Sequence, residues 1–166
     1  MINTIFIKKL NNMQFTFDVL SNIRPFFKSH IENNSLEDLN RIPEGFNNNI
    51  IWNIGHIVVT AQLLAYKLSG LPMHISDELV DKYRKDSKPA GAVSQEEVNQ
   101  IKALLFSTLD QLEADYNNNM FKTYNAYTVS TTGNTLTNID EALQFILFHE
   151  SMHLGYILAL KRAIKN

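Results

Sequence analysis

The chain contains no cysteine among its 166 residues, which excludes disulfide bonds, thiolate metal ligands and a cysteine nucleophile. It also lacks an excess of positive charge, because 15 Lys and Arg residues are balanced by 17 Asp and Glu residues. Proteins that bind nucleic acids usually carry a clustered basic excess, so we expect no nucleic-acid partner.

A long, uninterrupted apolar run is missing as well. The most apolar stretch, residues 50–65, is broken by Asn53, His56 and Gln62, and the first dozen residues lack the apolar core of a signal peptide. We therefore expect no membrane partner and a cytoplasmic location. The remaining composition is that of an ordinary globular protein, and the absence of linkers and repeats predicts a single domain over residues 1–166.

Short runs of asparagine separate four apolar-periodic segments, because asparagine favours caps and turns. These segments predict helices at about residues 12–33, 48–69, 94–116 and 138–165, with a shorter helix at 76–85. Pro25 is expected to kink or split the first helix, and residues 124–130 could pair briefly as a strand. The sequence thus predicts an all-α fold, an antiparallel four-helix bundle with long connections after the second and third helices.

Two of the five histidines, His149 and His153, stand four residues apart in an H-E-x-x-H string on the last predicted helix. At about 100° per residue, the two imidazoles lie in adjacent turns of one face, where both can reach a single divalent ion. The same winding places Ile146 and Ile157 on the histidine side, so this face is expected to be buried. Buried imidazoles need polar partners, either a metal ion or hydrogen bonds to side chains or water.

Two well-known kinds of metal site do not fit this string. A metalloprotease of the H-E-x-x-H type needs a third ligand downstream, and no His, Asp or Glu follows His153. A di-iron carboxylate bundle needs two E-x-x-H motifs, and the motif formed by Glu150 and His153 has no second copy. Any third protein ligand must therefore lie upstream.

His56 is the best upstream candidate for a ligand. It lies in a predicted helix that is apolar nearly all round and therefore expected to be buried, beside Gly55, which permits another backbone to approach closely. A hydrogen bond to a carbonyl would satisfy this histidine as well as a metal ion does. His30, near a helix end, and His74, in a loop, are expected to be exposed or capping residues.

These features resemble the DinB-like (DinB/YfiT) family of small metal-binding four-helix bundles. The resemblance rests on Trp-x-x-Gly-His-Ile in the second helix, on H-x-x-x-H in the last helix and on the order of the helices across nearly the whole chain. It implies one divalent ion, nickel or zinc in most cases, bound by His56, His149 and His153. Family members often carry glutamine where this chain has Tyr156, so the substrate is expected to differ if that glutamine contacts the ligand.

The resemblance also implies transferases or isomerases that use bacillithiol, mycothiol or glutathione. The first functional hypothesis is therefore a metal-dependent enzyme acting on a small-molecule substrate, an S-transferase with a low-molecular-weight thiol as cosubstrate. The second is a non-catalytic metal-binding bundle that serves stability or partner binding. Glu150 is either a base beside the metal or a carboxylate bonded to a neighbouring helix. Exposed flanks on the first and third helices, and pairing among relatives, predict a homodimer.

Overall fold

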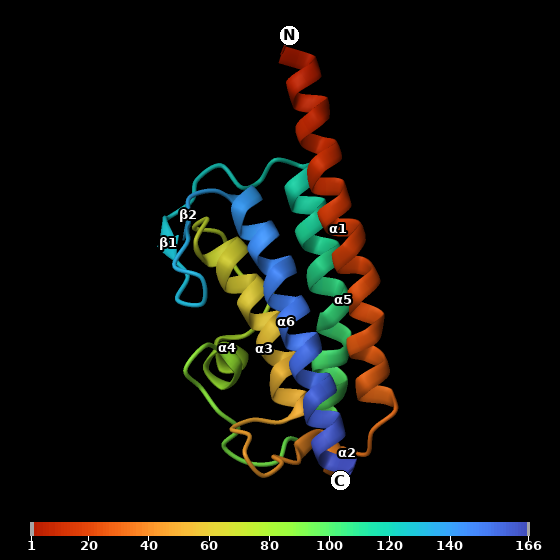
Figure 1. The fold of residues 1–166 in the computed structure, drawn as a ribbon. Coiled ribbons are helices and arrows are strands. Elements are labelled where there is room, and N and C mark those ends of the chain that lie inside the picture. Colours follow the sequence, from red (N-terminus) through yellow and green to blue (C-terminus); the bar gives the residue numbers. More distant parts are fainter. Residues whose placement is uncertain (1, 166) are drawn as a thin grey trace.

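Four long helices lie side by side in the computed structural model, which describes the backbone of residues 2–165 and the side chains of residues 13–165 (Figure 1). They are α1 (Ile2–Glu32), α3 (Ile50–Gln62), α5 (Gln95–Asn117) and α6 (Ile139–Lys165). The all-α four-helix bundle predicted from the sequence is confirmed. Among these described residues, no helix has the length and apolar character needed to cross a membrane.

Five shorter elements lie between the long helices. They are α2 (Leu36–Asn40), the π-helix η1 (Leu63–Lys67), α4 (Asp77–Tyr83), β1 (Tyr127–Thr128) and β2 (Thr135–Leu136). The helix predicted at 76–85 is confirmed by α4, and the brief strand predicted within 124–130 is confirmed by β1, which pairs antiparallel with β2. The predictions did not include α2, and η1 lies within the helix predicted at 48–69.

The long helices are not all antiparallel to their neighbours. In Figure 1, α3 and α5 begin at the end of the bundle where α1 and α6 finish, so α1 and α6 run parallel, as do α3 and α5. The contacts of Asn40 agree, because its carbonyl accepts from Asn49 just before α3 and its side-chain amide donates to Val93 just before α5. The predicted antiparallel arrangement is wrong for these two pairs, since the connection at residues 68–94 returns the chain along the bundle.

Local sequence explains where the helices begin. Four of them start with a side-chain oxygen that accepts a hydrogen bond from a backbone N–H of the first turn, at Ser35, Asn49, Ser76 and Ser94. At the start of α6, Asn138 caps the N–H of Glu141, whose carboxylate accepts from the N–H of Thr137 in return. These caps satisfy N–H groups that have no partner inside the helix.

Two helices differ from their predicted course. Pro25 does not split α1, which begins at Ile2 rather than near residue 12. Buried Leu20 and Phe27 on either side of the proline hold the helix in the bundle, so packing offsets the hydrogen bond that proline removes. The second predicted helix ends as the π-helix η1, in which the N–H of Leu68 donates to the carbonyl of Leu63.

Candidate metal centre

His56 of α3 meets His149 and His153 of α6 between the two helices. Their candidate ligand atoms all lie within 4.8 Å of one another, and Nε2 of His149 is 3.2 Å from Nε2 of His153. Two nitrogens bound to one ion at about 2.1 Å are separated by roughly 3.0 to 3.4 Å, so the α6 pair already has a suitable spacing. In the part of the chain that the structure describes, this is the only such group of His, Cys, Asp or Glu side chains.

The ring of His56 is held by a backbone carbonyl. Its Nδ1 lies 2.6 Å from the carbonyl oxygen of Tyr83, at the end of α4. Because a carbonyl oxygen only accepts, Nδ1 carries the proton and Nε2 keeps its lone pair. The indole of Trp52, one helical turn earlier, stacks on the imidazole with ring centroids 4.8 Å apart. The Thr60 hydroxyl lies 3.3 Å from Nε2.

The ring of His153 is held in the same tautomer by Asn53 of α3. Nδ1 of His153 lies 2.8 Å from Oδ1 of Asn53. The amide nitrogen of Asn53 donates to Asn48 and to the carbonyl of Asn49, so the Asn53 oxygen is the atom that faces His153. Nδ1 of His153 therefore donates, and its Nε2, 3.2 Å from Nε2 of His149, keeps the lone pair that a metal ion needs.

Burial keeps all three imidazoles neutral at neutral pH. Burial, together with smaller contributions from the neighbouring His153 and His56, lowers the pKa of His149 to about 2. Burial also lowers the pKa of His153 to about 4, with a smaller contribution from His56. The pKa of His56 is lowered by the same cause, against the hydrogen bond to Tyr83. Neutral imidazole is the form that binds metal, so the chemistry of this donor set fits a divalent ion.

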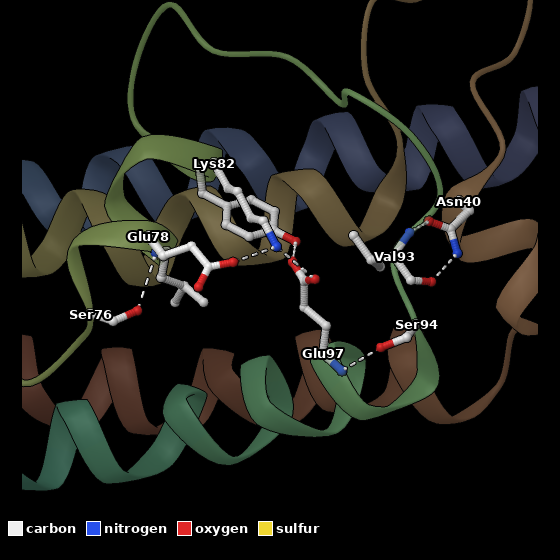
Figure 2. A network of polar contacts seen from close by, with 9 residues as sticks. Asn40, Ser76, Glu78, Lys82, Val93, Ser94 and Glu97 are labelled. Atoms are coloured by element: carbon white, nitrogen blue, oxygen red, sulfur yellow. Dashed lines mark hydrogen bonds and ion pairs between the residues drawn. The ribbon is translucent and has the colours of Figure 1, made fainter.

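A polar network ties α4 to α5 and so places the Tyr83 carbonyl. Figure 2 shows Lys82 of α4 and Glu97 of α5 pointing toward one another, with 3.1 Å between Nζ and Oε2. The Tyr83 hydroxyl donates to the other oxygen of Glu97 at 2.7 Å, and the Trp52 indole N–H donates to the Lys82 carbonyl. Ser94 caps the N–H of Glu97 at the start of α5, and the Glu97 carboxylate binds Tyr83 and Lys82 of α4 rather than turning back to Ser94.

Glu150, next to His149 in the sequence, faces a different helix. Its carboxylate accepts two hydrogen bonds from Arg24 of α1, which also donates to the carbonyl of Leu105 on α5. Both side chains of the ion pair are fully buried. Burial raises the pKa of the Glu150 carboxyl, and Arg24 opposes this shift. The prediction of a carboxylate bonded to a neighbouring helix is confirmed.

The other singled-out residues lie outside the histidine group. The prediction that His30 is exposed or capping is wrong, because its ring is buried near Lys161 and its Nδ1 has no hydrogen-bond partner among the described residues. His74 is exposed as predicted and lies 3.6 Å from a carboxylate oxygen of Asp115. Tyr156 packs edge-on against Phe46 and does not line the cavity described next.

A cavity of about 430 Å³ opens over the three histidines. This volume is typical of sites that bind small molecules. Besides the histidines, its wall is formed by residues of α3, η1, α6 and the connections: Thr60, Leu63, Leu64, Lys67, Leu68, Lys85, Tyr127, Val129, Ser130, Thr131, Phe145 and Met152. The three histidines predicted as ligands thus share one accessible space.

Two residues that orient the site were not predicted. The sequence could have indicated the role of Asn53, because an amide in an otherwise apolar helix must find hydrogen-bond partners. It could not have indicated the role of Tyr83, because this residue binds His56 through its backbone carbonyl, which every residue type carries.

The family model described as the DinB superfamily matches residues 22–157. This range contains all three histidines together with Asn53 and Tyr83. No curated protein matches the chain significantly.

Proposed function

Because the chain belongs to the DinB superfamily, we propose that it is a divalent-metal-dependent enzyme that transfers a group to or from a low-molecular-weight thiol. The observation that carries this proposal is the convergence of His56, His149 and His153 beside a cavity of small-molecule size. Three protein ligands leave coordination positions open, as catalytic sites do and closed structural sites do not. Imidazole nitrogen suits several divalent ions, and nickel or zinc is the metal we propose.

The residues of the chain prepare this site for a thiol. Tyr83 and Asn53 hold the protons of His56 and His153 on Nδ1, so that the Nε2 lone pairs face one another. A divalent ion bound there would lower the pKa of an incoming thiol and favour the thiolate near neutral pH. The chain has no cysteine, so the thiol must come from a cosubstrate. The apolar part of the cavity wall would reduce the amount of water around the reacting groups once a ligand fills the cavity.

Metal analysis of protein purified without chelator and without a nickel column tests whether the three histidines bind a divalent ion. We expect about one divalent ion per chain, lost in the variants His56→Ala, His149→Ala and His153→Ala. His74→Ala is the matched control, because His74 lies outside the group and should leave the metal content unchanged. Full occupancy in His56→Ala would contradict the assignment of a ligand on α3.

Thiol titration tests whether the site binds a thiol, and it distinguishes the thiol-dependent enzyme from a non-catalytic metal-binding bundle. Glutathione and bacillithiol are added to the zinc-loaded protein, and the melting temperature is followed. The enzyme predicts a rise with at least one thiol, absent in His149→Ala. A melting temperature that responds to zinc but to no thiol would favour a metal that serves stability alone.

We also propose that the protein forms a homodimer. Large apolar side chains are exposed on α1, where Phe15 and Phe26 are 68% and 60% exposed. The neighbouring helix α6 adds Phe148 and Leu158, also exposed. Exposed aromatic side chains of this size commonly mark a protein interface.

A further inference from the structure

The cavity over the histidines carries basic side chains at its mouth. Lys67, at the end of η1, and Lys85, just after α4, both line it and are exposed, whereas His56 and His149 are buried. The lysines therefore stand at the outer part of the cavity and the imidazoles at the inner part. Among the described lining residues there is no Asp or Glu.

Neither lysine is neutralised by a close, buried carboxylate. The nearest partner of Lys85 is Asp86, 3.9 Å away with a side chain that is 80% exposed. No ion pair of Lys67 is present among the described residues. Exposed pairs at such distances contribute little, so both ammonium groups remain available to a ligand.

The inner part of the cavity adds to this positive character. The three imidazoles are neutral, and Glu150, the carboxylate nearest to them in sequence, is already bonded to Arg24. A divalent ion on three neutral ligands would therefore bring its charge into the cavity without a compensating carboxylate. The positive electrostatic potential of such a cavity would favour an anionic ligand.

Most of the remaining cavity wall is apolar. Its apolar residues are Leu63, Leu64, Leu68, Val129, Phe145 and Met152, and the polar side chains of Thr60, Ser130 and Thr131 also line the cavity. An apolar wall of this kind stabilises a ligand by about 25 cal/mol for each Å² of apolar surface that it removes from water. A ligand without an apolar part would gain no such stabilisation from the wall.

We propose that the cavity binds an amphipathic carboxylate, a small molecule whose apolar body contacts this wall and whose carboxylate is bound by Lys67 and Lys85. The inference deepens the proposed function and rests on it, since this molecule is the substrate or the thiol cosubstrate of the same site. It also assigns a role in ligand selection to two residues outside the metal-binding group.

Calorimetric titration of the metal-free protein with octanoate and with octanamide tests the inference. The two probes share an apolar chain and differ in charge, so we expect octanoate to bind about tenfold more tightly. Lys67→Gln and Lys85→Gln should each weaken octanoate binding by roughly threefold, and the double variant should bind both probes equally. Lys28→Gln is the matched control, because Lys28 lies on α1, pairs with Glu32 and does not line the cavity.

Equal binding of the two probes by the unaltered protein would overturn the role of the lysines, as would full octanoate affinity in the double variant. Failure of both probes to bind would overturn the cavity as an amphipathic site. These outcomes are distinct from a failure of the proposed function, because the thiol titration uses zinc-loaded protein and His149→Ala. A thiol response without octanoate binding refutes this inference alone, and octanoate binding without a thiol response refutes the thiol-dependent function alone.

Discussion

The aromatic ring of Tyr83 packs directly against the backbone of Gly55. A Cβ at Gly55 would lie 2.5 Å from Cδ1 of Tyr83, closer than real Cβ contacts come. The sequence indicated that another backbone would approach this glycine, but what approaches is a ring, and the carbonyl of the same tyrosine binds His56 one residue further along. Glycine at this position therefore serves the metal centre as well as the packing of α3.

Gly55→Ala should lower both stability and metal affinity. The ring of Tyr83 is anchored at its hydroxyl by Glu97, so the added methyl group must push α4 away. We expect a loss of about 1–3 kcal/mol in the free energy of unfolding, as for other overpacked sites. Loss of the bond to Nδ1 of His56 should weaken zinc binding by about tenfold or more, measured by competition with a chelator.

Gly155→Ala is the matched control for that variant. Gly155 also lies inside a long helix, but nothing stands within 4 Å of a Cβ built there. Alanine is the better helix former by about 1 kcal/mol, so urea denaturation should show a gain in stability. Equal effects of the two alanine substitutions would contradict the packing of Tyr83 on Gly55.

The metal-free protein should lose stability as the pH falls from about 6.5 toward 4. In the folded state burial lowers the pKa of His149 to about 2 and that of His153 to about 4, while unfolded histidine titrates near 6.5. Over this window the unfolded chain binds protons that the folded chain does not, so the free energy of unfolding decreases with decreasing pH. Urea midpoints measured between about pH 7 and pH 5 check this pH dependence of the free energy of unfolding. The dependence should be weaker in His149→Gln.

Arg24→Met should be strongly destabilising. It leaves the carboxylate of Glu150 buried without its cation, which costs about 3–5 kcal/mol in comparable pairs. The double variant Arg24→Met with Glu150→Met should recover most of the loss, because no charge is then buried alone. Lys28→Met removes one partner of the exposed pair with Glu32 and should change the unfolding free energy by less than about 0.5 kcal/mol.

Light scattering of the purified protein is expected to give the mass of a dimer. Replacing Phe15 and Phe26 together by serine should shift the mass to that of the monomer, because these rings offer large apolar area on α1. Replacing exposed Met120 by serine is the control, since Met120 follows α5 and belongs to neither α1 nor α6. A monomer at all concentrations of the unaltered protein would contradict the proposed dimer.

Much of the helical framework was predictable because it depends on periodic burial and on caps. Ser94 begins α5 and Asn49 begins α3, each through a side-chain oxygen that the sequence displays. The histidine pair was predictable for the same reason, since the face that buries Ile146 and Ile157 also buries His149 and half-buries His153.

Features that depend on how distant segments meet were not predictable. A long connection permits either direction for the next helix, so the parallel course of α3 and α5 follows only from the path of residues 68–94. His30 lies near the end of its helix, where exposure is the usual outcome, and it is buried because the last turns of α6 come close, with Lys161 near its ring.

The segment that holds His56 in its tautomer is not one of the four long helices. Tyr83 ends α4, a short helix fastened to α5 through Lys82 and Glu97. Binding of a metal ion to the three histidines should therefore slow amide hydrogen exchange in α4. Opening of this helix would break its hydrogen bond to His56 and so release the metal ion. Exchange in the buried middle of α5 should change much less, so α4 would report metal loss before the bundle itself unfolds.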